Sequence, residues 1–499
     1  MAARNLYIDF HCHPELKTFL SSNLEKNRKD CWEDVDVTGL TEIADMLIGN
    51  PLDSQSSLSQ IKDGHISIAL AGLYAFEKPM ITGEIFELFK NKINLLKISR
   101  FIEKMDQRLL RRISSQKTSY FKIFNEVQNH LQKSAGIKPG YKLLNKISEY
   151  EPGKLNVILT IEGGHALYDQ LGNDEDVETT VLNNLHTLKN SATRYFFLTL
   201  THLVQIPMCT QAYGIKLIND DSFIPIGYGI SNLGKKVIAN ALDNQSGNRI
   251  LIDVKHMSLK ARLQYYDMLQ LPEFEGIPVI ASHCGVTGVS YREMPVYRYE
   301  VENDYVKVWY HKPQGLLNTK FNPWSINLYD EEIPVIINSG GIIGITLDER
   351  ILGTKQKTPE QTSEYFSKKE FNDYQSAIDH YSNKYMQLHN KAFEEIDNKI
   401  SLHNDLKHIC NNILHIVKTG GEKAWKHICI GSDFDGIINA VECCKNSEKY
   451  KKLARNLINW LPKLARADKS TDYYIGNIKD RVNDIMFGNA YRFLEKHFD

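Results

Sequence analysis

The sequence lacks any apolar stretch long enough to span a membrane. No run approaches the roughly 18 apolar residues that a transmembrane helix needs. The residues after Met1 contain no apolar signal-peptide region, and the last residues contain no anchor tail. We therefore expect a cytoplasmic protein with no membrane partner.

Cysteine pairs and an excess of one charge are also lacking. The eight cysteines among 499 residues are scattered, and none forms a C-x-x-C pair. This pattern indicates reduced thiols in the cytoplasm and excludes a disulfide framework. The formal net charge is −1, so no overall field favours nucleic acid or an acidic membrane, and we expect no nucleic-acid partner.

Eight short apolar runs, rich in Ile, Val and Leu, recur along the chain. They are continuous and not alternating, which is typical of parallel strands buried on both faces. Helical patterns separate them, for example over 181–189, 232–242 and 411–418. Strand and helix alternating eight times predict an α/β fold of the (β/α)₈ TIM-barrel class. The runs are 6–10, 65–73, 155–161, 194–200, 249–254, 277–281, 341–347 and 427–430.

We expect one barrel domain over residues 1–499, with three insertions. Residues from about 80 to 150 and from about 353 to 405 have helical patterns. Residues from about 294 to 326 are aromatic, and 297–302 and 305–310 alternate like the strands of a β-hairpin. Because this hairpin follows the sixth strand, we expect it to form a flap at the mouth of the barrel.

Metal-binding or acid–base side chains follow six of the eight predicted strands. The C-terminal ends of barrel strands converge on one face, where active sites lie. A single histidine in such a position is more often a hydrogen-bonded structural residue, but the joint pattern favours a metal site. The residues are His11 and His13, which share one face of their strand, then Glu162, His202, His256, His283 and Asp433.

These residue types suit metal-assisted hydrolysis. Two ions about 3.5–4 Å apart can share a bridging hydroxide and polarise a carbonyl group, and a carboxylate can bridge them. Asp433 is then expected to take the proton of the water and pass it to the leaving amine. His202 is expected to donate a hydrogen bond to the developing oxyanion. His165 is expected to orient the turn or a ligand and not to bind the metal directly.

The motifs around these residues follow one another in a specific order. They are E-G-G-H at 162–165, L-T-L-T-H at 198–202, I-D-V-K-H at 252–256, I-A-S-H at 280–283 and G-S-D-F-D-G at 431–436. With F-G-N-A-Y-R-F at 487–493, they resemble the renal (membrane) dipeptidase family of zinc peptidases, within the metal-dependent amidohydrolase superfamily. The resemblance extends from Ile8 to Leu494, apart from the insertions.

The resemblance implies a barrel enzyme with two zinc ions that hydrolyses dipeptides and tolerates a D residue at their C-terminal position. Some members of this family also open β-lactams. The implied roles are His11 and His13 on one ion, Glu162 as the bridge, His256 and His283 on the other ion, His202 at the substrate and Asp433 for proton transfer.

Two positions depart from the family pattern. The family's first strand ends in His-X-Asp, whereas this chain has His11-Cys12-His13, the form found in the wider amidohydrolase superfamily. The family also has an Arg after the sixth strand that binds the substrate carboxylate, and the aligned segment 324–327 contains none. Arg292 and Arg298 are the candidates to replace it as a substrate-binding residue.

We therefore predict a dinuclear zinc hydrolase that cleaves the amide bond of dipeptides or related small amides. The alternative is an amidohydrolase-type enzyme that acts on a lactone, an aminated base or a phosphoester, which the His-X-His start favours. A third reading is a non-catalytic metal-binding barrel that binds a ligand through its aromatic hairpin. A small molecule or dipeptide is the expected partner, and a homodimer is left open.

Overall fold

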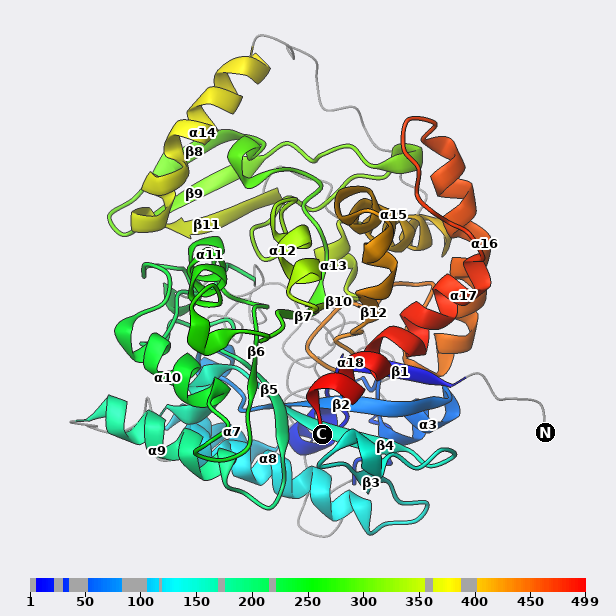
Figure 1. Ribbon diagram of the computed structural model, residues 1–499. Coiled ribbons are helices and arrows are strands. Elements are labelled where there is room, and N and C mark those ends of the chain that lie inside the picture. The colour runs from blue at the N-terminus through cyan, green and yellow to red at the C-terminus, as the bar shows by residue number, and fades with distance from the viewer. Residues whose placement is uncertain are drawn as a thin grey trace, which may run out of the picture.

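A parallel sheet lies at the centre of the molecule and helices surround it (Figure 1). The computed structural model describes residues 6–21, 30–35, 53–82, 106–115, 119–168, 176–214, 221–354, 362–386 and 402–499. Within these ranges no helix combines the length and the apolar character needed to cross a membrane.

Eight parallel strands follow one another around the sheet in the order β1-β2-β4-β5-β6-β7-β10-β12. Beyond β12, Phe434 pairs in parallel with Cys12, which brings the eighth strand back beside the first. The predicted (β/α)₈ barrel is therefore confirmed. The strands are β1 (Tyr7–Cys12), β2 (Ile66–Tyr74), β4 (Asn156–Glu162), β5 (Tyr195–Thr199), β6 (Leu251–Asp253), β7 (Ile280–Cys284), β10 (Ile342–Ile345) and β12 (Ile428–Ile430), with β3 (Lys142–Leu143) paired to β4.

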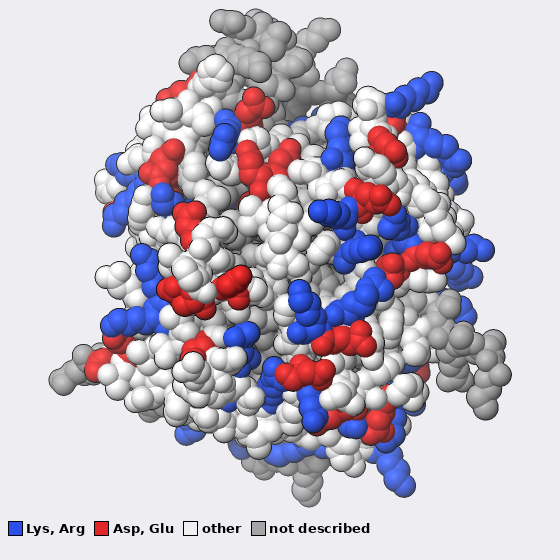
Figure 2. Space-filling view, in the orientation of Figure 1, with Lys and Arg blue, Asp and Glu red and all other residues white. Residues whose placement is uncertain are grey.

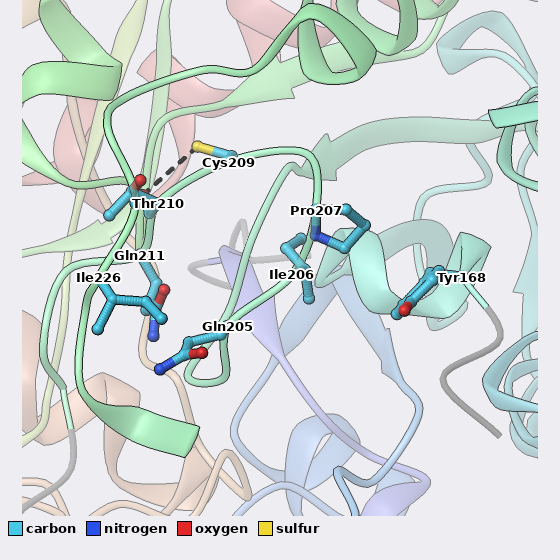
Figure 3. Close-up of a pocket in the computed structure, with 9 residues that line it drawn as sticks. Tyr168, Gln205, Ile206, Pro207, Cys209, Thr210, Gln211 and Ile226 are labelled. Carbon is cyan, nitrogen blue, oxygen red and sulfur yellow. Dashed lines mark hydrogen bonds between the residues drawn. The ribbon is translucent and has the colours of Figure 1, made fainter. Parts of the chain in front are cut away.

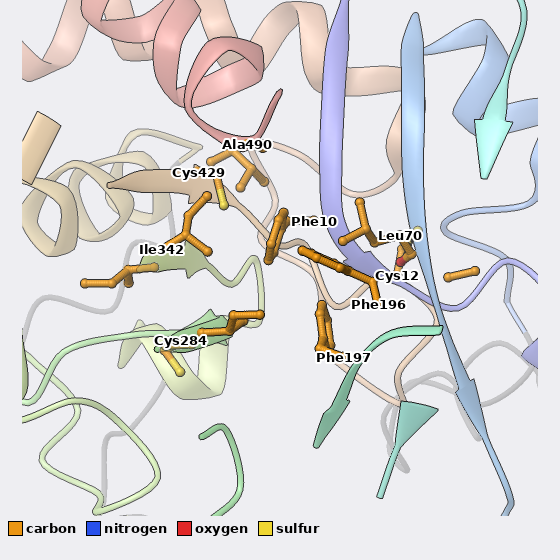
Figure 4. Packing of buried hydrophobic residues seen from close by; sticks show 14 of the residues in the cluster. Phe10, Cys12, Leu70, Phe196, Phe197, Cys284, Ile342, Cys429 and Ala490 are labelled. Carbon is orange, nitrogen blue, oxygen red and sulfur yellow. Dashed lines mark hydrogen bonds between the residues drawn. The ribbon is translucent and has the colours of Figure 1, made fainter. Parts of the chain in front are cut away.

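The strands form where the chain is apolar on both faces. Every residue of β1, β2 and β4 is buried, so each strand lies between the barrel interior and the helical layer. Phe10 of β1 packs against Phe196 of β5, with the ring centroids 6.4 Å apart (Figure 4). Its ring centroid also lies 5.9 Å from that of Phe493. All eight cysteines are buried and free, as expected for reduced thiols.

The three helices expected from the sequence are present as α9 (Val177–Lys189), α10 (Asn232–Leu242) and α15 (Leu402–Gly420). Asp176 and Ser231 cap the first two by accepting hydrogen bonds from backbone N–H groups of the first turn. The other barrel helices are α1 (Leu16–Leu20), α3 (Leu58–Asp63), α11 (Leu259–Met268), α12 (Glu332–Asn338), α13 (Glu349–Leu352), α16 (Tyr450–Ala467), α17 (Ile478–Asn483) and α18 (Asn489–His497).

The first predicted insertion is mainly helical where the structure describes it, and its last part contains the short strand β3. It contains α4 (Pro79–Thr82), α7 (Gln107–Ser114) and α8 (Tyr120–Ala135), while residues 83–105 lie outside the described ranges. In the second insertion β8 (Val296–Val301) and β9 (Tyr305–Tyr310) form the predicted antiparallel hairpin.

The third insertion differs from the expectation over five residues. We predicted helix, and α14 (Lys368–Met386) is helical, but β11 (Ser363–Ser367) is a strand. It pairs antiparallel with β9 and completes a three-stranded sheet beside α14 (Figure 1). The strand depends on a partner more than 50 residues away, which a local pattern of five residues does not reveal. Residues 355–361 and 387–401 lie outside the described ranges.

A buried ion pair connects α11 to the loop and helix that follow the hairpin. Arg262 donates to both carboxylate oxygens of Glu332, through Nε at 2.6 Å and Nη2 at 2.9 Å. Its remaining N–H groups donate to the carbonyl oxygens of Met257, Ser325 and Asn327. Burial opposes the charge on Arg262, but Glu332 raises the pKa of the guanidinium above its ordinary value.

Replacing Arg262 by Met should destabilise the protein by about 3–5 kcal/mol, because the carboxylate of Glu332 then stays buried without a counter-ion. Urea unfolding would measure the loss. The matched control is Arg112→Met, which breaks a half-exposed ion pair with Glu126 at 2.7 Å and should cost about 0–1 kcal/mol. Equal losses in both variants would contradict the assigned importance of the buried pair.

Candidate metal centre

The carboxylate of Glu162, at the C-terminal end of β4, lies at the centre of five histidine rings. Each barrel strand delivers its last side chains to this face, so residues far apart in sequence meet here. All the histidines predicted to bind metal are in this group. Glu162 Oε2 lies 3.0 Å from His13 Nε2, and Oε1 lies 3.3 Å from His11 Nε2, 3.5 Å from His256 Nε2, 3.6 Å from His283 Nε2 and 3.8 Å from His202 Nε2.

His11 and His13 reach the centre from β1, where strand alternation directs both rings to the same side. His13 Nδ1 donates to the carbonyl oxygen of Gly72 at 2.5 Å, which leaves Nε2 as the nitrogen facing Glu162. Gly72 on β2 also provides the space for these rings. A Cβ atom there would lie 2.9 Å from Cε1 of both His11 and His13.

His256 follows β6, and His283 lies near the end of β7. Their Nε2 atoms lie 3.2 Å apart. The backbone of His256 has a positive φ of 65°, a turn that interrupts the strand alternation. His283 Nδ1 lies 2.7 Å from Ser282 Oγ, and Ser282 Oγ donates to the buried Asp253 at 2.5 Å. This chain of contacts orients the His283 ring.

His202, which follows β5, is held by a carboxylate that the sequence reasoning missed. His202 Nδ1 lies 3.2 Å from Oε2 of the fully buried Glu77. Tyr74 donates its hydroxyl to the same oxygen at 2.9 Å, and the backbone N–H groups of Leu203 and Val204 donate to Oε1. Glu77 therefore directs His202 Nε2 towards the centre.

His165 has neighbours other than Glu162. Its Nε2 donates to the carbonyl oxygen of Ala75 at 2.7 Å, and its Nδ1 lies 3.7 Å from Glu77 Oε1. The ring also packs edge-on against Tyr120, with the centroids 5.3 Å apart. The side chain thus contributes to the wall behind His202.

Asp433 follows β12 and has a positive φ of 63°. Its Oδ1 lies 3.6 Å from His13 Nε2 and 3.8 Å from His11 Nε2, and its Oδ2 lies 4.0 Å from His283 Nε2. Asp435, two residues on, turns away and accepts hydrogen bonds from the backbone N–H groups of Gln55 and Ser56.

Burial and mutual charge set the protonation of the centre. Burial by itself raises the pKa of Glu162, but the surrounding histidines lower it well below its ordinary value, which favours the carboxylate. Burial lowers the pKa of His256 to about 3 and that of His283 well below its ordinary value. Burial raises the pKa of Asp433. Burial opposes the charge on His13 and His202, but Glu162 raises the pKa of His13 well above its ordinary value and Glu77 raises that of His202. The ionised carboxylate of Glu162 and the neutral imidazoles of His256 and His283 are in the forms that bind a divalent metal.

The residues of the centre fit such a metal. Two overlapping groups have donor atoms that all lie within 4.8 Å of one another, and Glu162 belongs to both. Several buried nitrogens have no hydrogen-bond partner in the described chain, namely both nitrogens of His11, Nε2 of His13 and Nδ1 of His256. Imidazole nitrogens with carboxylate oxygens are a donor set typical of zinc. The groups are His11, Glu162, His283 and Asp433, and Glu162, His202 and His256.

A small cavity opens onto the centre. Its volume is about 40 Å³, and His202, His256 and Asp433 line it together with Lys255 and Arg350. In this conformation it has room for a small polar group such as a carboxylate or an amide.

The two arginines considered from the sequence lie elsewhere. Arg292 is exposed on a short 3₁₀ helix, and it is not among the residues that line the cavity. Arg298 is also exposed, forms an ion pair with Glu300, and lies over the Trp309 ring at 4.5 Å.

Glu77, Lys255 and Arg350 are the functional candidates that the sequence reasoning missed. A signal existed for two of them, because Glu77 and Arg350 follow β2 and β10, the two strands to which we had assigned no candidate. Lys255 precedes His256, and alternation alone would place the two side chains on opposite faces. The turn at His256 lets both line the cavity.

A second, larger cavity of about 250 Å³ lies beside the segment that follows β5 (Figure 3). Gln205, Thr210 and Gln211 contribute polar groups to its wall, and Ile206 and Ile226 contribute apolar ones. None of its described lining residues is a histidine or a carboxylate, so the cavity does not extend the candidate metal centre.

The comparisons with known proteins agree with the motifs. The family model described as membrane dipeptidase (peptidase family M19) matches residues 318–464, which confirms the resemblance drawn from the sequence. Among curated proteins no relative matches the chain.

Several solved structures are similar to this chain. A probable dipeptidase, PvdM, from Pseudomonas aeruginosa is 15% identical, covering 99% of this chain and 96% of that one, with a TM-score of 0.48. A metallo peptidase from Rhodobacter sphaeroides, liganded with a phosphinate mimic of L-Ala-D-Ala, is 14% identical, with 99% of both chains covered and a TM-score of 0.49.

Replacing Gly72 by Ala should weaken metal binding about 10–100-fold, as changes behind metal ligands do, because the added methyl group displaces the rings of His11 and His13. Competition with a chelator would measure the affinity. Gly136→Ala is the control, since its nearest atom would be the Lys133 carbonyl oxygen at 3.9 Å. Unchanged affinity in Gly72→Ala would show that these two rings do not hold the metal.

Proposed function

We propose that this protein, a metal-dependent hydrolase that resembles the membrane dipeptidases, cleaves the amide bond of dipeptides or related small amides and uses two zinc ions. One observation carries the proposal. The buried carboxylate of Glu162 lies within 3.8 Å of ring nitrogens from five histidines, which come from the ends of four different strands.

We assign the ligands as the resemblance to the dipeptidases implies. His11 and His13 would hold one ion, His256 and His283 the other, and Glu162 would bridge them. When bound, two such ions polarise a carbonyl group and make a water molecule more acidic. His283 also lies close to His11, with ring centroids 4.0 Å apart, so the two ligand pairs form one continuous set.

Asp433 and His202 supply the remaining chemistry. Asp433 lies on the cavity wall, 3.6 Å from His13 Nε2, where its carboxylate can accept the proton of the attacking water and return it to the leaving nitrogen. Burial opposes the charge on His202, but Glu77 raises its pKa and so favours the imidazolium form. In that form Nδ1 donates to Glu77, and the N–H group at Nε2 faces the cavity and can donate to the developing oxyanion.

The partner that fits this site is a small molecule. The cavity is small, and on the face shown in Figure 2 acidic and basic side chains are interspersed, with no continuous basic surface of the kind that nucleic acid requires.

His13 in place of a carboxylate favours a second candidate function, the hydrolysis of a lactone, an aminated base or a phosphoester at the same centre.

Purified protein should contain about two zinc ions per chain and should hydrolyse some dipeptide among a panel of L,L and L,D compounds. A chelator should abolish the activity, and added zinc should restore it. Elemental analysis and amino-acid release would measure both. Turnover of esters, lactones or aminated bases without any dipeptide turnover would favour the second candidate function, and a chain that binds no divalent ion would contradict both.

Replacing Asp433 by Asn should lower kcat by about 10²–10⁴-fold, because an amide cannot carry the proton. The metal content should be retained, since the five ligands assigned above are unchanged. Asp267→Asn, a change at an exposed position on α11, is the matched control and should leave kcat unchanged. An Asp433→Asn enzyme with normal turnover would rule out the assigned role.

A further inference from the structure

Lys255 brings a buried positive charge to the cavity beside the metal centre. The residue is only 2% exposed, yet it is among the residues that line the cavity, together with His256, Asp433 and Arg350. A hydrogen bond holds the backbone of this residue in place, because the Lys255 N–H donates to Asp253 Oδ1 at 3.1 Å. Lysine is seldom buried to this extent unless a partner compensates its charge.

No such partner is present among the described residues. No carboxylate in that part of the chain lies within 4.0 Å of Lys255 Nζ, and the ammonium group makes no hydrogen bond to it. The other cation of the cavity is different. Arg350 is engaged with Asp348, through Nε at 3.1 Å and Nη2 at 2.8 Å, and it also donates to the Ile437 carbonyl oxygen.

The charge of Lys255 also disfavours protonation of the neighbouring histidines. It lies close enough to His256 and His283 to contribute to the low pKa of each imidazole, after the larger effect of burial. A buried cation without a counter-ion costs free energy in the protein alone. The arrangement becomes favourable when an anionic group enters the cavity and pairs with it.

We propose that Lys255 binds the carboxylate of the substrate and so selects small amides that have a negative charge next to the scissile bond. This inference rests on the proposed amide hydrolysis and adds the residue that determines specificity. An anion on Lys255 would lie beside His256, so the adjacent amide would be positioned against the metal centre. Lys255 contacts the substrate and takes no part in proton transfer.

The test compares two substrates that differ only in charge, a dipeptide with a free C-terminal carboxylate and the same dipeptide with a C-terminal amide. The wild-type enzyme should prefer the free acid. Lys255→Met should raise KM for the acid about 10–100-fold, as expected for loss of a hydrogen bond to a charged group, with little change in kcat. KM for the amide substrate should change less than about threefold.

Two further variants make the result specific. Lys255→Arg keeps the positive charge and should retain most of the preference for the acid. Lys260→Met removes a lysine five residues away, whose Nζ pairs with Asp373 at 2.6 Å outside the cavity, and should leave both substrates unaffected. Metal content and thermal midpoint should be the same in all the variants.

The outcomes separate this inference from the proposed function. If the wild-type protein hydrolyses neither substrate, amide hydrolysis itself is wrong. If it hydrolyses both and Lys255→Met impairs them equally, or changes the metal content, then Lys255 does not bind the carboxylate. An enzyme that keeps its preference for the acid after Lys255→Met would overturn the inference in the same way.

Discussion

A carboxylate held away from water is the constraint on which the rest of the centre depends. Glu162 is buried at the end of β4, and an ionised carboxylate in such a place costs several kcal/mol unless other groups compensate it. Five histidines surround this carboxylate. Its negative charge is balanced when a metal cation binds among the rings or when a ring takes up a proton. The arrangement is therefore unfavourable in the protein alone and becomes favourable when divalent ions bind.

Further buried carboxylates hold the strand ends that carry these ligands. Asp9 of β1 accepts hydrogen bonds from the N–H and hydroxyl groups of Ser432, at 3.0 and 2.6 Å, just before Asp433. Asp253 of β6 accepts from the same two groups of Ser282, at 3.0 and 2.5 Å, just before His283. In both cases a carboxylate on one strand fixes the backbone beside a functional residue on another, so the reactive side chains are positioned before any ligand binds.

The cavity beside the centre contains two cations that differ in their surroundings. Arg350 is neutralised by Asp348 and supports the wall, whereas no carboxylate of the described chain lies within 4.0 Å of the Lys255 ammonium group. This difference is what connects the metal centre to a choice of substrate. A site that combines imidazoles, a central carboxylate and one uncompensated ammonium group is suited to a small anionic amide.

The sequence by itself determined the barrel and most of the centre, because strands buried on both faces require continuous apolar runs and the barrel brings their C-terminal ends together. Only the tertiary structure decided three other features. β11 forms because β9 offers it an edge, Glu77 acts because it meets His202 across 125 residues, and Lys255 lines the cavity because the backbone turns at His256. Each depends on a long-range contact or a positive φ, and neither leaves a periodic pattern in the sequence.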